Sequence, residues 1–255
     1  KKDRQRAKKK RQAQQNAPPQ QVRPQPKGRR LWLFRFVGVF IIPALMILGL
    51  EVGLRVSGYG VPTGFTFEQE VRGQNRILSN PYFMWRFFEP QLARESSPFS
   101  RPLTKAPGTY RVFVLGASAA EGTPEPAYGM TRMLDAMLRD QYPGVDFDVI
   151  NAAITATNSH VVLPIARECS RLESDLFVIY LGNNEVVGPY GAGTVFSPLA
   201  PNLSMIRAGI ALKATRLGQL LPNVMAKIRG RDRAQPERWL GMKMFLNHQV
   251  RATDP

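Results

Sequence analysis

The sequence has 255 residues, 35 Lys or Arg against 19 Asp or Glu, and a formal net charge of +16. Twelve of the basic residues and one acid, Asp3, fall within residues 1–30, so this segment alone carries +11. The charge is therefore local, and it does not indicate that the folded part of the chain binds nucleic acid. The single cysteine, Cys169, excludes an intrachain disulfide and is expected to be a small buried residue. Two histidines, without clustered cysteines or acids, do not indicate a zinc site.

Residues 1–30 form a basic tail rich in Lys, Arg, Gln and Pro, without apolar periodicity. Such a segment cannot bury enough apolar surface to fold alone, so we expect it to be disordered unless a partner binds it. Its basic residues would attract anionic lipid headgroups, each contributing about 1 kcal/mol near the surface. Two alternatives stay open: a membrane protein complex that holds the tail, and nucleic acid, which the sequence does not favour.

Residues 31–50 form a largely apolar run with the length of one transmembrane helix, since a bilayer core needs about 20 such residues. Arg35 lies one turn inside the run and can extend back to the headgroups, and Pro43 predicts a kink. Basic residues precede the run far more densely than they follow it. This asymmetry predicts a single-pass protein with a cytoplasmic N-terminus and a periplasmic or otherwise extracytoplasmic main domain. The alternatives are a buried core helix and a cleaved signal peptide, but the run is apolar on every face and no Ala-x-Ala-like site follows it.

Residues 51–107 contain scattered aromatic residues and prolines, and they are expected to form a juxtamembrane linker region with one or two edge strands. Beyond this region, apolar runs predict three strands, and helical spacing predicts helices between and after them. The expected strands are 110–115, 145–150 and 176–181, and the expected helices are 128–142, 161–172 and a helix or helical pair within 204–229. Strands that alternate with helices indicate parallel βαβ units. We therefore expect residues 108–255 to form a doubly wound, flavodoxin-like, three-layer α/β domain that is incomplete at its C-terminal end.

Small or amide residues stand where each predicted strand ends. Ser118 follows the first strand, Asn151 and Ala153 follow the second, and Asn184 follows the third. The carboxyl ends of parallel strands meet at one edge of a sheet, where ligands bind. A serine hydroxyl and amide donors at such an edge form the grouping that a nucleophile and an oxyanion site need. The alternative is that Ser118 caps a helix and that the asparagines serve in turns.

These three segments resemble the motif blocks of the SGNH (GDSL-like) hydrolase family. They read Gly-Ala-Ser at 116–118, Asn-Ala-Ala at 151–153 and Gly-Asn-Asn-Glu at 182–185. The resemblance implies that Ser118 is the nucleophile. It also implies an oxyanion hole formed by the backbone N–H groups of Ser118 and Ala153 and the side chain of Asn184, with Asn151 in a supporting role.

The chain departs from the family pattern at three positions. Ala117, Ala153 and Glu185 stand where the family has Asp, Gly and Asp. The chain also contains no Asp-x-x-His, the block that carries the general base in this family. We expect the chain to be a piece of a longer protein whose base lies downstream, rather than at His160 or His248.

The basic tail, the membrane segment and the hydrolase-like core together resemble large membrane-anchored bacterial members of the family, in which tetratricopeptide repeats often follow. The resemblance implies an extracytoplasmic serine esterase or acyl-transfer enzyme of the bacterial envelope that needs no metal or cofactor, with an ester substrate that the sequence does not specify. The alternative is a non-catalytic hydrolase-like accessory or scaffold subunit of a membrane complex. The substitutions at Ala117 and Ala153 and the missing Asp-x-x-His favour this second hypothesis.

Overall fold

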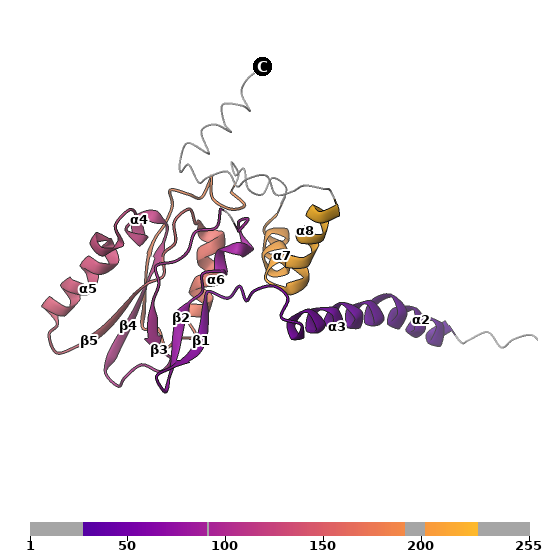
Figure 1. Ribbon diagram of the computed structural model, residues 1–255, viewed down its shortest axis with the longest axis horizontal. Helices are drawn as coiled ribbons and strands as arrows, with labels where there is room; N and C mark the ends of the chain where they lie inside the picture. Colours follow the sequence, from indigo (N-terminus) through magenta and orange to yellow (C-terminus); the bar gives the residue numbers. More distant parts are fainter. Residues whose placement is uncertain (1–27, 91, 192–201, 229–255) are drawn as a thin grey trace, which may run out of the picture. The chain divides into compact units, whose positions relative to one another are not determined.

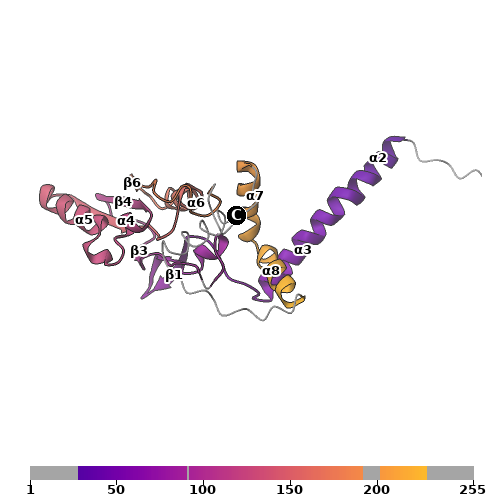
Figure 2. The same ribbon diagram turned by 90° about the horizontal axis from the view of Figure 1, so that it is seen from above.

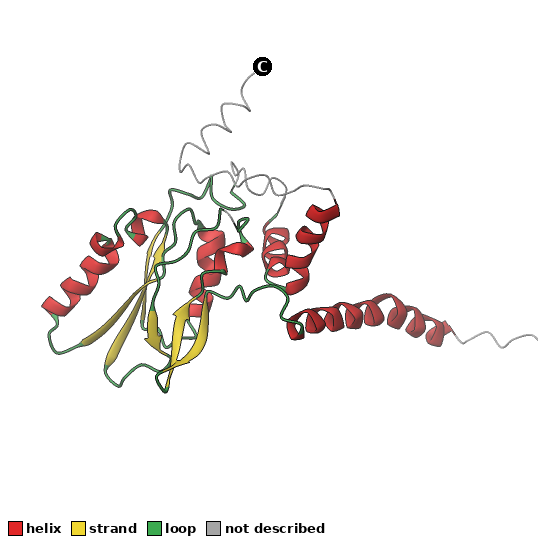
Figure 3. Cartoon of the chain, in the orientation of Figure 1, coloured by secondary structure: helices red, strands yellow, loops and turns green. Residues whose placement is uncertain are grey.

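A computed structural model of the chain describes residues 28–90, 92–191 and 202–228 (Figure 1). The basic tail up to residue 27 lies outside these residues, as does His248. The chain divides into two compact units, Lys1–Gly49 and Leu50–Pro255. The second unit has a mixed α/β fold that contains a parallel sheet (Figure 3).

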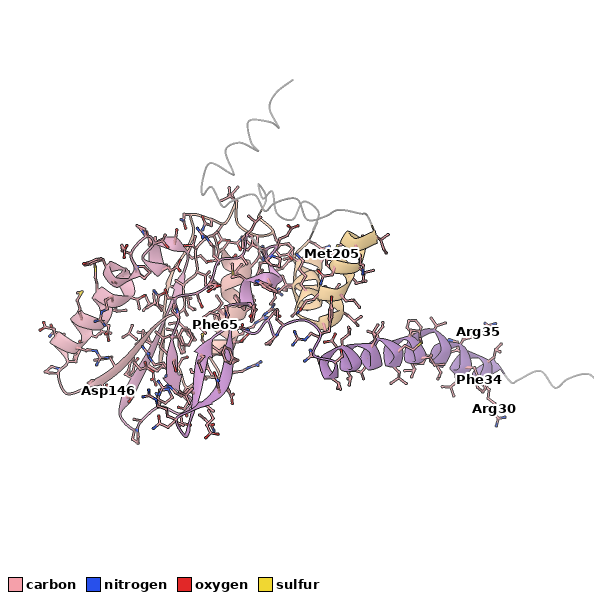
Figure 4. All side chains as sticks on the ribbon, viewed as in Figure 1. Arg30, Phe34, Arg35, Phe65, Asp146 and Met205 are labelled. Atoms are coloured by element: carbon pink, nitrogen blue, oxygen red, sulfur yellow. The ribbon has the colours of Figure 1, made fainter. Side chains whose placement is uncertain are left out.

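A helical run near the N-terminus consists of α2 (Gly28–Phe36), the π-helical turn η1 (Val37–Ile41) and α3 (Ile42–Val56). Within it, Arg30–Val56 is the one helix among the described residues that is long and apolar enough to cross a membrane. The π turn lies in the turn before Pro43, the second residue of α3. Proline has no backbone N–H and crowds the preceding turn, a common cause of irregularity in a helix. The apolar side chains of this run, such as Phe34, are exposed along the helix (Figure 4).

The parallel sheet has β4 (Thr109–Gly116) at its centre, with β5 (Asp146–Asn151) and β6 (Leu176–Tyr180) on either side. All three strands lie within one or two residues of the ranges that the apolar runs predict. Every residue of β4 from Arg111 to Gly116 is buried. A parallel strand that is covered on both faces is largely apolar, which is why residues 112–115 of β4 form a continuous apolar run in the sequence; the buried Arg111 before this run is the exception.

Two helices lie on opposite sides of β4 and β5: α5 (Met130–Gln141), which follows β4, and α6 (Ser159–Cys169), which follows β5 (Figure 1). The short helices α4 (Ser118–Glu121) and η3 (Pro126–Tyr128) precede α5. Each face of the sheet has its own apolar cluster. The α6 side contains Phe113, Leu115, Ile150, Val161, Ile165 and Cys169, and the α5 side contains Val112, Val114, Val149, Met130, Leu134 and Leu138. The expectation that Cys169 is buried is confirmed.

Residues 51–107 contain a second, antiparallel sheet in the order β1 (Thr66–Val71), β2 (Gln74–Ser79), β3 (Ser100–Pro102), and the short helix η2 (Phe83–Arg86). Their aromatic residues belong to the same cluster as α6: Phe65, Phe83, Phe87 and Phe88. Figure 4 labels Phe65 within this part of the fold. The region expected to be a linker thus supplies part of the main core. Its aromatic residues come from loops and a short turn, so no regular spacing in the sequence reveals that they share one core.

The last described elements are α7 (Leu203–Lys213) and α8 (Arg216–Ile228), which confirm the helical pair expected within 204–229 (Figure 1). The Glu51 carboxylate accepts hydrogen bonds from the backbone N–H groups of Arg216, at 3.1 Å, and Leu217, at 3.0 Å. Both N–H groups lie in the first turn of α8, where no intrahelical acceptor exists, so Glu51 caps this helix.

Candidate functional site

Ser118 is the first residue of α4, the single helical turn that follows the central strand. The chain turns sharply at Gly116, where a Cβ atom would lie 2.2 Å from the Tyr180 carbonyl oxygen and 2.6 Å from the Ala120 Cβ. Only glycine fits this close approach between the ends of β4 and β6. The Ser118 side chain is partly exposed, and its backbone N–H lies in the first turn of a helix, where it has no intrahelical acceptor.

Hydrogen bonds tie the three motif segments to one edge of the sheet. The Gly116 carbonyl accepts from the Ile154 backbone N–H at 3.1 Å and from the Thr157 hydroxyl at 3.0 Å. The Thr157 carbonyl in turn accepts from the Asn184 side-chain amide at 3.1 Å. The turn that carries Ser118 is therefore linked through Thr157 to the loop that carries Asn184, although 66 residues separate the two in the sequence.

Asn151 joins α4 to its own loop. Its side-chain amide donates to the Glu121 carbonyl at 2.9 Å, and its Oδ1 accepts from the Ala153 backbone N–H at 3.2 Å. This arrangement supports the position of Ser118, because Glu121 ends the turn that Ser118 begins. It also engages the Ala153 N–H, which the family resemblance assigns to an oxyanion hole. A substrate oxygen would have to replace the Asn151 Oδ1 as its acceptor.

The Asn184 amide group is held in one orientation by its bond to the Thr157 carbonyl, and the side chain is partly exposed. A carboxamide carries two N–H hydrogens, and this bond uses one of them. The second hydrogen can donate to a ligand without breaking an existing bond. Among the residues that the resemblance assigns to the oxyanion hole, the Asn184 side chain and the Ser118 N–H are thus more readily available than the Ala153 N–H.

Glu121, Thr123 and Thr155 form a polar cluster beside Asn151, and no pattern in the sequence predicts that these three residues come together. The Glu121 Oε2 accepts from the Thr123 hydroxyl at 3.1 Å and from the Thr155 hydroxyl at 2.5 Å, and the two hydroxyl oxygens are 2.9 Å apart. Glu121 is buried, so its carboxylate depends on these donors. The threonines lie in loops after different strands and belong to no motif. The one signal in the sequence is an acid inside the small-residue stretch that follows Ser118.

His160 and Glu185 have positions that clarify their roles. His160, in the first turn of α6, lies edge to face with Tyr190 at a ring-centroid distance of 6.1 Å. No hydrogen bond joins it to Ser118 within the described part of the chain.

The Glu185 carboxylate accepts hydrogen bonds from the Ser159 backbone N–H, at 2.9 Å, and from the Ser159 hydroxyl, at 2.7 Å. The residue that stands where the family has Asp therefore caps the N-terminus of α6.

Comparisons with known proteins add no identification. No model of a protein family matches this chain, and a search of the curated proteins finds no match either. Among the described residues, no group of three or more His, Cys, Asp and Glu side chains is arranged to hold a metal ion. The resemblance to the SGNH hydrolases therefore stays a prediction that rests on the three motif segments.

Proposed function

We propose that the chain is a membrane-anchored serine hydrolase of the SGNH type that cleaves an ester or transfers its acyl group. The observation that carries this proposal is the position of the Ser118 hydroxyl. It lies partly exposed at the start of α4, directly after the central parallel strand, at the edge to which Asn151 and Asn184 are also tied. The carboxyl edge of a parallel sheet is where such folds bind their ligands.

The finer description of the fold belongs to the same proposal. The strand order β5-β4-β6 has the first strand of the parallel sheet at the centre, as in a flavodoxin-like fold. Separate apolar clusters on the α5 and α6 sides support a doubly wound, three-layer arrangement. In such a fold, the ligand-binding crevice lies between two neighbouring strands whose following connections go to opposite faces of the sheet. In this chain those strands are β4 and β6.

The proposed chemistry is acyl transfer through Ser118. Its Oγ attacks the ester carbonyl carbon while a general base takes the hydroxyl proton. The negative oxygen that results is held by the Ser118 N–H and the Asn184 amide, and by the Ala153 N–H once this group leaves Asn151. The ester C–O bond then breaks, and the alcohol leaves with the proton. Water or another hydroxyl group releases the acyl group from Ser118. We propose that the base comes from outside the described residues, because no hydrogen bond joins His160, the one histidine among them, to Ser118.

Membrane anchoring is the second part of the proposal. The apolar helix Arg30–Val56 has the length to span a bilayer, and its apolar side chains are exposed. The excess of basic residues before it supports a cytoplasmic N-terminus and an extracytoplasmic main domain. The tail would lie among anionic headgroups.

A serine-reactive fluorophosphonate probe tests the hydrolase proposal on the full-length protein in membranes. We expect the wild type to be labelled and Ser118→Ala to remain unlabelled. The matched control is Ser170→Ala, an exposed serine just after α6 whose hydroxyl donates to the Arg167 carbonyl. This variant should be labelled like the wild type. If a folded wild-type protein shows no labelling, the hydrolase proposal is wrong.

A non-catalytic accessory subunit is the second candidate function. The observation that favours it is the engagement of polar groups at the proposed site with one another: the Ala153 N–H with Asn151, and the Asn184 amide with Thr157. Polar groups that bond to one another within the protein are typical of a site whose role is only structural. For this candidate we expect no labelling, together with co-purification of a membrane protein that is lost when residues 1–27 are deleted.

A further inference from the structure

A pocket of about 310 Å³ lies among α6, α7 and η2, and none of the proposed catalytic residues lines it. Its charged lining comprises four arginines and a single acid: Arg86, Arg167, Arg171, Arg207 and Glu168. His160 lies at the same pocket, together with apolar side chains of α6 and α7. Figure 2 shows α6 and α7 from above. So many guanidinium groups around one small pocket require an explanation, because like charges repel when nothing lies between them.

The pocket is built on elements that are fixed by the core. Arg167 lies in the last turn of α6, and Arg171 lies in the turn that follows this helix, where its backbone N–H donates to the Glu168 carbonyl at 3.0 Å. Arg207 comes from α7, which is held by the burial of Ile206 and Ile210 in the main cluster. Arg86 comes from η2, whose neighbouring side chains Phe83 and Met84 belong to the same cluster. The four guanidinium groups thus come from three separately anchored segments.

The positive charge at this pocket is far from balanced. Arg86 is only 13% exposed, and its Nε is buried without a hydrogen-bond partner among the described residues. Its nearest acid is Glu168, with 4.0 Å between Nη1 and Oε1. The other Glu168 oxygen already accepts from the Phe65 backbone N–H at 2.6 Å. Burial lowers the pKa of the Arg86 guanidinium, and the negative charge of Glu168 opposes this effect.

The three remaining arginines, Arg167, Arg171 and Arg207, are exposed and have no ion pair within the part of the chain that the structure describes. Glu168 can neutralise at most one of the four guanidinium charges. A bound anion would neutralise the remaining guanidinium charges. It would also give the buried Arg86 Nε an acceptor, and a buried donor without an acceptor is costly.

We infer that this pocket binds a phosphoryl-bearing anion. A guanidinium group presents its N–H donors in a planar fork that matches two oxygens of a phosphate, so arginines from several elements suit this ligand better than a monovalent halide. The volume lies at the small end of the range for ligand pockets and suits a phosphate or pyrophosphate group with a short apolar portion. Leu163, Leu203 and Ile210 would contact that portion. The anion has two possible sources, a lipid headgroup and a soluble phosphorylated compound. The inference is independent of Ser118.

Calorimetric titration of the full chain in non-ionic detergent with pyrophosphate tests this inference at physiological salt. The variant is Arg171→Gln combined with Arg207→Gln, two exposed residues whose replacement should leave the core intact. We expect its affinity for pyrophosphate to fall by about tenfold or more, since hydrogen bonds to charged groups are lost. The matched control is Arg132→Gln on α5, whose side chain is 72% exposed. It should change the affinity by less than about twofold. Because the basic tail is present in every variant, differences in affinity report on the pocket.

Two results would overturn the inference: no pyrophosphate binding by the folded wild type, or equal affinities in the wild type and the double variant. Circular dichroism and the thermal midpoint verify that the double variant is folded. Nanodiscs of phosphatidylcholine, alone or in an equal mixture with phosphatidate, then separate the two sources. If phosphatidate in the nanodiscs lowers the apparent affinity of the wild type for pyrophosphate, the pocket binds a lipid headgroup. If this affinity is the same in both kinds of nanodisc, the pocket binds a soluble phosphorylated compound.

Discussion

The Arg111 guanidinium donates from Nε to the Asp148 Oδ2 at 3.0 Å, and only 1% of its side chain is exposed. Its other nitrogens donate to the Leu172 carbonyl at 2.8 Å and the Pro102 carbonyl at 3.0 Å. The second Asp148 oxygen accepts from the Arg101 Nε at 2.6 Å. Arg111 therefore links the central parallel strand to β5, to the turn after α6 and to β3 of the antiparallel sheet.

Removal of the Asp148 carboxylate should strongly destabilise the fold. Asp148→Ala leaves the buried Arg111 charge without its partner, and we expect the free energy of unfolding to fall by about 3–5 kcal/mol. Arg101→Ala removes a partner that is 38% exposed, and it should cost about 1 kcal/mol or less. Urea denaturation of both variants measures the difference. Similar losses in the two variants would show that burial of the Arg111 charge does not control stability here.

Gly116 should be irreplaceable even by alanine. A Cβ atom at this position would overlap the Tyr180 carbonyl oxygen and the Ala120 methyl group. We expect Gly116→Ala to lower the free energy of unfolding by about 1–3 kcal/mol and to displace Ser118, so that probe labelling also falls. Gly144→Ala is the control, because a Cβ atom there has no neighbour within 4 Å. Equal stability and labelling in the two variants would argue against the close approach of β4 and β6.

The elements that the sequence predicts well are those whose environment imposes a regular pattern. Residues 112–115 of β4 are buried on both faces and therefore form a continuous apolar run, and α5 shows helical spacing because one of its faces packs against the sheet. The same reasoning places Ser118, Asn151 and Asn184 at the ends of parallel strands, and the structure ties them to one edge.

The features that the sequence does not predict depend on contacts between distant segments. The loops and the short helix around the antiparallel sheet contribute the aromatic side chains of Phe65, Phe83, Phe87 and Phe88 without a regular spacing. The bonds from Glu121 to Thr123 and Thr155 join loops after different strands, and the arginine pocket combines three elements. In each case the residues become neighbours only when the chain folds. The bond between the Ala153 N–H and Asn151 is likewise a matter of local geometry that a motif cannot specify.

Asn184 should be more important for reaction at Ser118 than its distance along the sequence suggests. Under the hydrolase proposal, Asn184→Ala removes an oxyanion donor that is already oriented by Thr157, and we expect the rate of probe labelling to fall by about 10²–10³. Asn75→Ala, an exposed asparagine in β2, is the control and should leave the rate unchanged. Stopped-time labelling gives both rates. An unchanged rate in Asn184→Ala would remove this residue from the proposed oxyanion site.

Acid should weaken the fold in part through Asp175. Its Oδ2 accepts from the Lys105 ammonium group and from the Arg111 backbone N–H, and these bonds hold the pKa of the Asp175 carboxyl below its ordinary value of 3.8. Because the folded-state pKa is the lower one, the stabilisation is fully present above the unfolded pKa and is lost as the pH falls through the folded pKa.

The matching variant is Asp175→Asn, measured by urea denaturation at neutral pH and below about pH 4. At neutral pH we expect a loss of about 1 kcal/mol relative to the wild type, since the ion pair with Lys105 is partly exposed. The difference between the two proteins should shrink as the acid protonates Asp175. A difference that stays constant across this range would show that the carboxylate contributes nothing through its charge.

Cys169 offers a direct measure of how often the core opens. It is the one cysteine of the chain and is fully buried in the main cluster. Burial raises the pKa of its thiol, and the negative charge of Glu168 raises it further. Because the thiolate is the reactive form, iodoacetamide should modify Cys169 only when the surrounding core opens.

We expect Ile165→Ala, which leaves a cavity in the same cluster, to lower the free energy of unfolding by about 2–4 kcal/mol and to speed modification of Cys169 accordingly. Leu163→Ala, at an exposed position on the same helix, should change stability by about 0.5 kcal/mol or less. Modification of the wild type at the rate of a free thiol would mean that α6 does not stay packed against the sheet.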